Sequence, residues 1–264
     1  MKISAIVQTY NAAAQLGACL RALQGFDEIL VVDMESTDET VEIARAAGAR
    51  VVIKERSDHR IVEAYRDFAI HEARYDWVLV VDADEIVPDA LRRYLYEAIE
   101  ADPTPRAVLI PIKNYFMGRW MRCYYPDYIL RFFHRVGAHW PYAIHSRPSH
   151  EGPEIRIPAS RTDLAYIHLA NESVSRSITK MNGYTDREMD RRRAHFKPVQ
   201  LLYAPAYRFF KTYFLKGGWR CGWPGFVHAV LDGMYRFTLL SKLLEETHHY
   251  PDIARDTRES REQA

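Results

Sequence analysis

The stretch WVLVVDADE, residues 77–85, decides the fold prediction for this chain. Its first five residues are apolar, with three valines among them, which is typical of a strand buried on both faces of a parallel sheet. Asp82 and Asp84 follow at positions i and i+2, where strand side chains point to the same side. Ligands of open α/β sheets bind beyond the carboxyl ends of the strands, so we predict a ligand site at this pair.

Three further apolar runs precede this stretch: ISAIVQ from residue 3, EILVVD ending at residue 33, and ARVVIK ending at residue 54. Segments with helical periodicity separate the runs, and their apolar faces are formed by Leu16, Leu20 and Leu23 and, after Pro88, by Leu91, Leu95 and Ile99. This alternation predicts an α/β fold with a Rossmann-like, mostly parallel sheet. Gly25 and Gly48 can each end a helix in the left-handed conformation.

The spacing of Ser36 and Glu39, S-x-x-E, predicts a capping box at the start of the second helix. From residue 106 to residue 168, extended pieces rich in aromatic residues predict a small mixed sheet over the main one. From residue 173 the pattern is helical again. We therefore expect an α/β domain in residues 1–170, a helical C-terminal appendage in 171–250, and a charged tail in 251–264.

Composition limits the partners. The 36 Lys and Arg nearly cancel the 35 Asp and Glu, which leaves a net charge of +1 and no overall field to attract nucleic acid, so no nucleic-acid partner is expected. The three cysteines are far apart and lack C-x-x-C spacing, which disfavours a disulfide framework and a structural zinc site. The sequence also lacks a signal-peptide pattern and an apolar run of about 18 residues, so a cytoplasmic protein is expected.

Asp82 and Asp84 together suit Mg²⁺ or Mn²⁺, because such ions are commonly held by one or two carboxylates while substrate phosphates and water complete the shell. A diphosphate is the implied partner. Asp33 ends another predicted strand and opens on the same crevice if the sheet is parallel. For Asp33, a contact with the base or ribose of a nucleotide and a purely structural role both stay open.

Six pieces of the sequence, in order, resemble the family-2 glycosyltransferases of GT-A fold, particularly the bacterial lipopolysaccharide core β-glucosyltransferase branch. They are VQTYNAAAQL, VVDMESTDET, YRDFAIHEARYDWVLVVDADE, NYFMGRW, YPDYILRFF and RFFKTYFLKGGWRCGWPGF. The resemblance implies that a sugar is transferred from a nucleotide-sugar donor such as a UDP-sugar. The implied acceptor is a saccharide or a glycolipid, in the synthesis of lipopolysaccharide or another cell-envelope glycan.

The resemblance also implies roles for individual residues. The nucleotide is expected near Thr9, Tyr10, Asn11 and Asp33, the diphosphate near Arg66 and Asp82, and the metal near Asp82, Asp84 and His168. A lone histidine is more often satisfied structurally, so for His168 both interpretations stay open. The chain departs from the family pattern at Ala12, Ala13, Met34 and Glu35, which leaves the choice of nucleotide open.

For the chemistry, the resemblance implies inversion by a single displacement, in which a carboxylate deprotonates the acceptor hydroxyl. The segment YPDYILR offers Asp127 as this base, with Arg131 to hold the base or a substrate anion. The alternative is that Asp127 begins a turn after Pro126. A glutamate that the family places after a histidine is missing here, since Ser146 follows His145.

Rival functions differ in what they require. A nucleotidyltransferase or a dinucleotide-dependent oxidoreductase would need a glycine-rich loop after the first strand, and VQTYNAAA contains no glycine. A non-catalytic nucleotide-sugar-binding or scaffold protein of the same fold remains as the alternative.

Aromatic and cationic residues interleave between Arg208 and Arg220. This mixture is typical of a helix in a membrane interface, and the alternative is a core helix with solvated cations. The resemblance implies lipid-linked acceptors at the cytoplasmic face, so we expect peripheral attachment to an anionic membrane surface at that face of the inner membrane.

Overall fold

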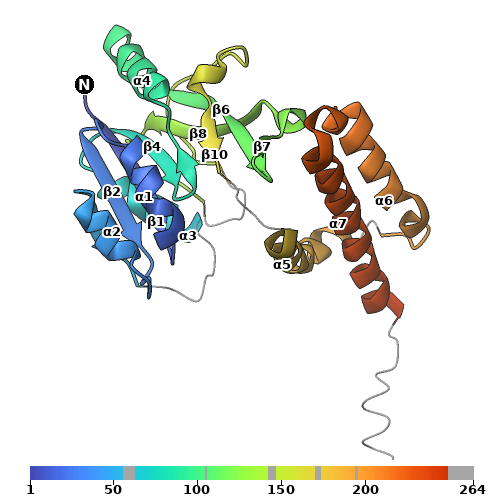
Figure 1. Cartoon of the computed structure of the whole chain (residues 1–264). Coiled ribbons are helices and arrows are strands. Elements are labelled where there is room, and N and C mark those ends of the chain that lie inside the picture. The colour runs from blue at the N-terminus through green and yellow to red at the C-terminus, as the bar shows by residue number, and fades with distance from the viewer. Residues whose placement is uncertain (56–62, 105, 142–146, 170–173, 194–195, 249–264) are drawn as a thin grey trace, which may run out of the picture. The chain divides into compact units, whose positions relative to one another are not determined.

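The computed structural model describes residues 1–55, 63–104, 106–141, 147–169, 174–193 and 196–248 (Figure 1). The chain forms two compact units, one of residues 1–115 with 124–170 and one of residues 116–123 with 171–264. The charged tail, residues 251–264, lies outside the described residues, as do His145 and Ser146.

The first unit holds the α/β sheet. Its elements are β1 (Ile3–Thr9), α1 (Ala13–Ala22), β2 (Glu28–Asp33), α2 (Thr40–Ala46), β3 (Arg50–Ile53), α3 (Glu63–Glu72), β4 (Trp77–Asp82), β5 (Glu85–Ile86), α4 (Asp89–Ala101), β6 (Ala107–Phe116), β8 (Asp127–His134), β9 (Glu154–Arg156) and β10 (Tyr166–His168). The strand order is β3-β2-β1-β4-β8-β6-β10-β5, with β9 beside β6. Because β1 pairs in parallel with both β2 and β4, and β2 with β3, the predicted mostly parallel α/β sheet is confirmed.

The sheet buries both of its faces. Along β1, Ile3, Ala5 and Val7 belong to one hydrophobic cluster, and Ile6, which points to the opposite face, belongs to the other. The first cluster includes the predicted apolar faces of α1 and α4, whose leucines and Ile99 are fully buried. The second cluster is covered by Ala69 and Ile70 of α3. Burial on both faces explains why these strands are continuously apolar.

Two local predictions need correction. The strands after residue 106 do not lie over the main sheet but continue it, because β8 pairs antiparallel with β4 and with β6. The capping box is also wrong, since α2 begins at Thr40 and its N-cap residue, Glu39, makes no side-chain capping bond. Ser36 is instead held at the end of β2 by Asp33. Competition from a buried carboxylate therefore outweighed the local capping pattern.

The second unit is mainly helical. It contains β7 (Arg119–Trp120), α5 (Val174–Arg192), α6 (Gln200–Phe210), the π-helical turn η4 (Lys211–Leu215), the 3-10 turn η5 (Gly218–Cys221) and α7 (Gly222–His248). Leu239, Leu240 and Leu243 of α7 form a small core with side chains that include Met189 and Leu201. Among the described helices, none is both long and apolar enough to cross a membrane.

Two glycines allow η5 and α7 to meet. A Cβ atom on Gly225 would lie 2.0 Å from the carbonyl oxygen of Gly218, closer than any side chain can approach. The glycines of the GGWRCGWPGF segment therefore reflect close backbone packing inside this unit.

Candidate active site

The carboxyl ends of β1 and β2 form the first part of the site. Thr9 and Asp33 are paired in the sheet register, and the Thr9 hydroxyl donates to Asp33 Oδ2 at 2.7 Å. Asp33 Oδ1 accepts the backbone N–H of Ser36 at 2.8 Å, and the Asp33 side chain is fully buried. Asp33 therefore has a structural role in holding this loop, and its contact with a base or ribose stays a prediction.

Asn11 joins the loops that follow β1 and β2. Its backbone N–H donates to Ser36 Oγ at 2.8 Å, and its Oδ1 accepts the backbone N–H of Thr37, also at 2.8 Å. Asn11 and Glu35 both have positive φ angles, 47° and 56°, which non-glycine residues seldom adopt. Strained residues of this kind persist where the surrounding contacts hold them and cluster at ligand sites. Tyr10, next to Asn11, is exposed.

Asp82, at the end of β4, is held by two arginines. Arg66 of α3 donates to its Oδ1 at 2.9 Å, and Arg131 of β8 donates to its Oδ2. Burial alone raises the pKa of Asp82, but the Arg131 and Arg66 cations outweigh it and hold that pKa below its usual value. The Arg66 guanidinium also lies 4.9 Å from the centre of the Trp140 ring. Arg131 therefore holds Asp82 and not the predicted base, Asp127, while its contact with a substrate anion stays a prediction.

Glu85 completes this charged group, and the sequence analysis did not select it. Its Oε2 accepts the backbone N–H of Asp82 at 2.8 Å, and its Oε1 lies 3.8 Å from Arg131 Nη2. Burial, together with the charge of Asp82, raises the pKa of Glu85 to about 7. The signal that could have identified it is the third acid of the run DADE.

A series of polar contacts links Asp84 to Asp127 through His168 and Asn114. His168 Nε2 lies 3.4 Å from Asp84 Oδ2, and His168 Nδ1 lies 2.9 Å from Asn114 Oδ1. Asn114 Nδ2 in turn donates to Asp127 Oδ2 at 3.1 Å. The sheet makes this possible, because β6 lies between β8 and β10 and places Asn114 level with His168. Sequence analysis missed Asn114, although it is the first residue of the NYFMGRW segment.

The contacts of Asn114 determine which ring nitrogen of His168 carries the proton. A carboxylate can only accept, so Asn114 Nδ2 faces Asp127 and Asn114 Oδ1 accepts the N–H of His168 Nδ1. In the neutral ring, Nε2 then carries a lone pair directed toward Asp84, an arrangement that a proton or a metal ion stabilises. Burial lowers the pKa of His168, but the hydrogen bond and charge of Asp84 outweigh it and raise that pKa.

The donor set suits a divalent ion that takes most of its ligands from elsewhere. Among the described residues, no three His, Cys, Asp or Glu side chains converge closely enough to hold a metal ion by themselves. Asp84 and His168 form a partly exposed oxygen and nitrogen pair, whereas both carboxylate oxygens of Asp82 are bonded to arginines. One or two protein ligands fit an ion that is completed by phosphate oxygens and water.

The sequence profile described as Glycosyl transferase family 2 matches residues 4–150 of this chain, which is more than half of its length and includes the carboxyl ends of β1, β2 and β4. The chain belongs to this family. The resemblance that the six sequence pieces indicated is thereby confirmed, and this family-2 glycosyltransferase can be compared with its relatives.

Relatives align over nearly the whole chain. The lipopolysaccharide core biosynthesis glycosyltransferase LpsC of Rhizobium meliloti is 27% identical, over 93% of this chain and 93% of its own length. An uncharacterized glycosyltransferase of Rickettsia felis is 26% identical, over 92% of this chain and 90% of its own. Among solved structures, S. aureus TarS 1-349 aligns with 96% of this chain and 93% of its own, at 15% identity and a TM-score of 0.48.

Proposed function

We propose that this family-2 glycosyltransferase moves a sugar from a nucleotide-sugar donor, with a UDP-sugar as the first candidate, to a saccharide or glycolipid acceptor. The observation that carries the proposal is the series of polar contacts from Asp84 through His168 and Asn114 to Asp127. It joins a carboxylate suited to a metal ion with a carboxylate suited to a base. The name of the LpsC relative supports a role in lipopolysaccharide or another cell-envelope glycan.

The donor is expected at the carboxyl ends of β1, β2 and β4. The base and ribose lie against the loops of Tyr10 and Asn11, which Thr9 and Asp33 hold in place. Arg66 receives the diphosphate, because guanidinium groups bind phosphate oxygens with paired hydrogen bonds. Competition from the diphosphate for Arg66 frees one oxygen of Asp82, which is how Asp82 becomes available as a metal ligand.

Mg²⁺ or Mn²⁺ is assigned to Asp84 and His168, with Asp82 as the further ligand. When bound, the ion supplies charge stabilisation to the departing diphosphate. The contribution of the chain itself is the orientation of His168, since Asn114 holds its Nδ1 side and leaves Nε2 for coordination.

Asp127 acts as the base. It lies exposed at the start of β8, and Asn114 holds its Oδ2. Its carboxylate takes the proton of the acceptor hydroxyl as that oxygen attacks the anomeric carbon. The bond from the anomeric carbon to the diphosphate oxygen breaks in the same displacement, and its electron pair leaves with the diphosphate. One such displacement inverts the configuration at the anomeric carbon.

The second unit is assigned to the membrane. Phe210, Phe214, Trp219 and Trp223 are 48%, 50%, 52% and 76% exposed, so these side chains do not form the core of their unit. Exposed aromatic rings beside lysines and arginines suit a membrane interface with anionic lipid. We assign peripheral attachment at the cytoplasmic face, where a lipid-linked acceptor would be reached.

Donor hydrolysis tests the proposal. Purified protein is incubated with UDP-sugars and Mn²⁺, and release of UDP is compared between the wild type and Asp84→Ala, with circular dichroism as the control for folding. Metal-dependent release by the wild type and none by the variant is expected. Equal rates in both proteins would remove Asp84 from the site, and no release or transfer with any donor would favour the non-catalytic alternative.

A further inference from the structure

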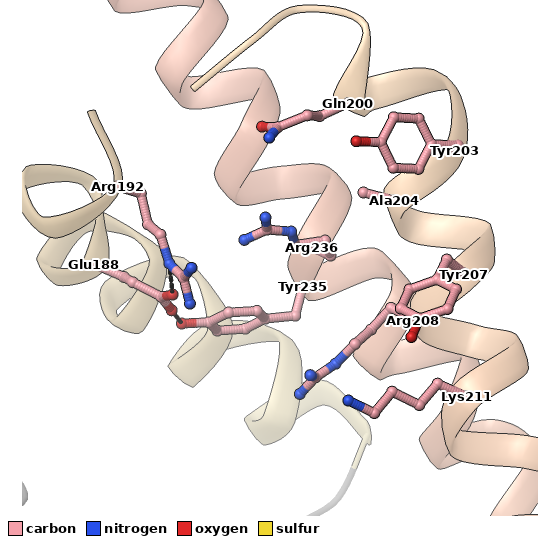
Figure 2. A pocket seen from close by; sticks show the side chains of 10 residues that line it. All are labelled: Glu188, Arg192, Gln200, Tyr203, Ala204, Tyr207, Arg208, Lys211, Tyr235 and Arg236. Atoms are coloured by element: carbon pink, nitrogen blue, oxygen red, sulfur yellow. Dashed lines mark hydrogen bonds and ion pairs between the residues drawn. The ribbon is translucent and has the colours of Figure 1, made fainter. Parts of the chain in front are cut away.

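The helical unit contains a cavity of about 360 Å³ that is lined by none of the residues assigned to sugar transfer (Figure 2). Its walls come from α5 on one side, from α6 and the first residue of η4 on the other, and from α7 between them. The residues that line it are Glu188, Arg192, Gln200, Tyr203, Ala204, Tyr207, Arg208, Lys211, Tyr235 and Arg236.

Positive charge exceeds negative charge in this cavity. Four of the lining side chains are cations, and Glu188 is the one lining carboxylate. Glu188 accepts from Arg192 Nε at 2.8 Å, and Arg208 Nε donates to Asp232 at 2.9 Å. Within the described part of the chain, Lys211 and Arg236 make no ion pair or hydrogen bond. The four lining cations, counted with Glu188 and Asp232, therefore exceed the carboxylates by two.

The pKa of Arg236 also reflects the excess of positive charge around it. Burial, followed by the positive charge of Arg192, lowers the pKa of Arg236, and Arg208 acts in the same direction. An arginine stays protonated under these conditions, so the repulsion between the cations persists until an anion enters.

Glu188 does not supply the missing negative charge. Tyr235 and Arg192 both donate to it, and although burial alone raises the pKa of Glu188, these hydrogen bonds lower it. The carboxylate is thus ionised and already engaged by residues of the wall. Among the described residues, no further carboxylate neutralises Lys211 and Arg236, so we look to a bound anion for this role.

We propose that this cavity binds a phosphomonoester. Such a group carries about two negative charges at neutral pH, equal to the excess of the cavity, and its oxygens accept the donors that line it. The Tyr203 and Tyr207 rings supply apolar walls and hydroxyl groups for the part of the ligand that bears the phosphate. Both a soluble sugar phosphate and a phosphorylated lipid headgroup have this chemistry. Binding here requires none of the residues assigned to sugar transfer.

Isothermal titration calorimetry of the full-length protein with inorganic phosphate and with glucose 6-phosphate tests the proposal. The wild type is expected to bind both saturably, and Arg236→Gln to weaken binding roughly tenfold or more, since it removes a charged donor. Arg220→Gln is the matched control, because Arg220 is an exposed cation over the Trp219 ring in the same unit and does not line the cavity. Lys211→Gln provides a second test if Arg236→Gln lowers the melting temperature.

The outcomes separate the cavity from surface charge. Absence of saturable binding by the wild type, or equal weakening by Arg220→Gln and Arg236→Gln, would overturn the proposal.

Sedimentation with vesicles identifies the source of the phosphate. The vesicles are phosphatidylcholine with either phosphatidic acid or, at equal charge, phosphatidylglycerol. If Arg236→Gln weakens sedimentation with phosphatidic acid but not with phosphatidylglycerol, the ligand is a lipid headgroup. If Arg236→Gln weakens only the binding of glucose 6-phosphate, the ligand is soluble. Asp84→Ala should bind phosphate normally, so failure of transfer and failure of this site are distinguishable.

Discussion

The two charged regions of this molecule differ in how their charges are compensated. At the sheet edge, Arg66 and Arg131 share Asp82, and His168 faces Asp84, so each of these cationic groups has an internal partner. In the helical cavity, Lys211 and Arg236 have none among the described residues. Under the proposed function, the sheet-edge site exchanges internal partners for ligand groups, whereas under our proposal for the cavity its free cations gain a partner only with the ligand.

Burial explains the difference. The Arg131 side chain is 9% exposed, and such a desolvated charge is tolerated only beside an opposite charge. Lys211 and Arg236 are only half-buried, so water still solvates them and they can lack partners at modest cost. Loss of the carboxylate that the two sheet-edge arginines share should therefore affect activity and stability together, whereas substitutions in the cavity should affect binding alone.

The largest effect is expected from Asp84→Ala. This substitution removes the carboxylate opposite His168 Nε2 and should abolish metal-dependent transfer and hydrolysis, which a coupled assay for UDP release measures. The fold should persist, because Asp84 is partly exposed and lies outside the core. Near-normal turnover in this variant would remove the metal from this edge of the sheet.

Asp82→Ala should also unfold more easily. It leaves Arg66 and Arg131 without their shared carboxylate, and we expect a loss of about 3 kcal/mol in the free energy of unfolding, measured by urea denaturation. Lys211→Gln is the comparison from the other region and should change stability by less than about 1 kcal/mol, because among the described residues it has no ion pair to lose. Similar losses in the two variants would show that burial does not distinguish the two regions.

Asp127→Asn should lower the transfer rate by on the order of a hundredfold with little change in donor affinity, as removal of a general base does. Asparagine preserves the size of the side chain, so the effect reports chemistry rather than packing. Steady-state kinetics with separate kcat and KM values provide the measurement. Unaltered kcat would place the base elsewhere.

Asn114→Ala should have an intermediate effect. Loss of the amide releases His168 Nδ1 and Asp127 Oδ2 together, so we expect Mn²⁺ affinity to fall roughly tenfold, as other outer-shell substitutions do. Titration of Mn²⁺ followed by calorimetry measures this without turnover. Lys113→Ala is the matched control on the same strand, and equal losses in both variants would deny Asn114 its orienting role.

The smallest effect is expected for membrane binding, on changes in salt and at Trp223. Full-length protein should sediment with anionic liposomes at low salt and be partly released at high salt, because screening weakens the electrostatic attraction. At the same salt concentration, Trp223→Ser should bind less than the wild type, since Trp223 is 76% exposed and adds apolar contact with the lipid. A protein that ignores anionic liposomes at low salt would have these rings covered by another protein surface.

Local sequence determined much of the first unit. The four apolar runs became β1 to β4, the leucines at helical spacing became buried faces, and Gly25 and Gly48 took the predicted positive φ angles of 95° and 78°. Each depends on residues close together in the chain, where periodicity and glycine chemistry suffice. The acidic pair of Asp82 and Asp84 at a strand end was visible for the same reason.

Tertiary structure decided which side chains meet. The bonds from Arg131 to Asp82 and from Asn114 to both His168 and Asp127 depend on the order and register of β4, β8, β6 and β10, which pair across long stretches of chain. Periodicity shows which face a strand side chain occupies but not which strand lies beside it. The same limit explains Ser36, whose local pattern predicted a cap, because the buried carboxylate of Asp33 was the stronger partner.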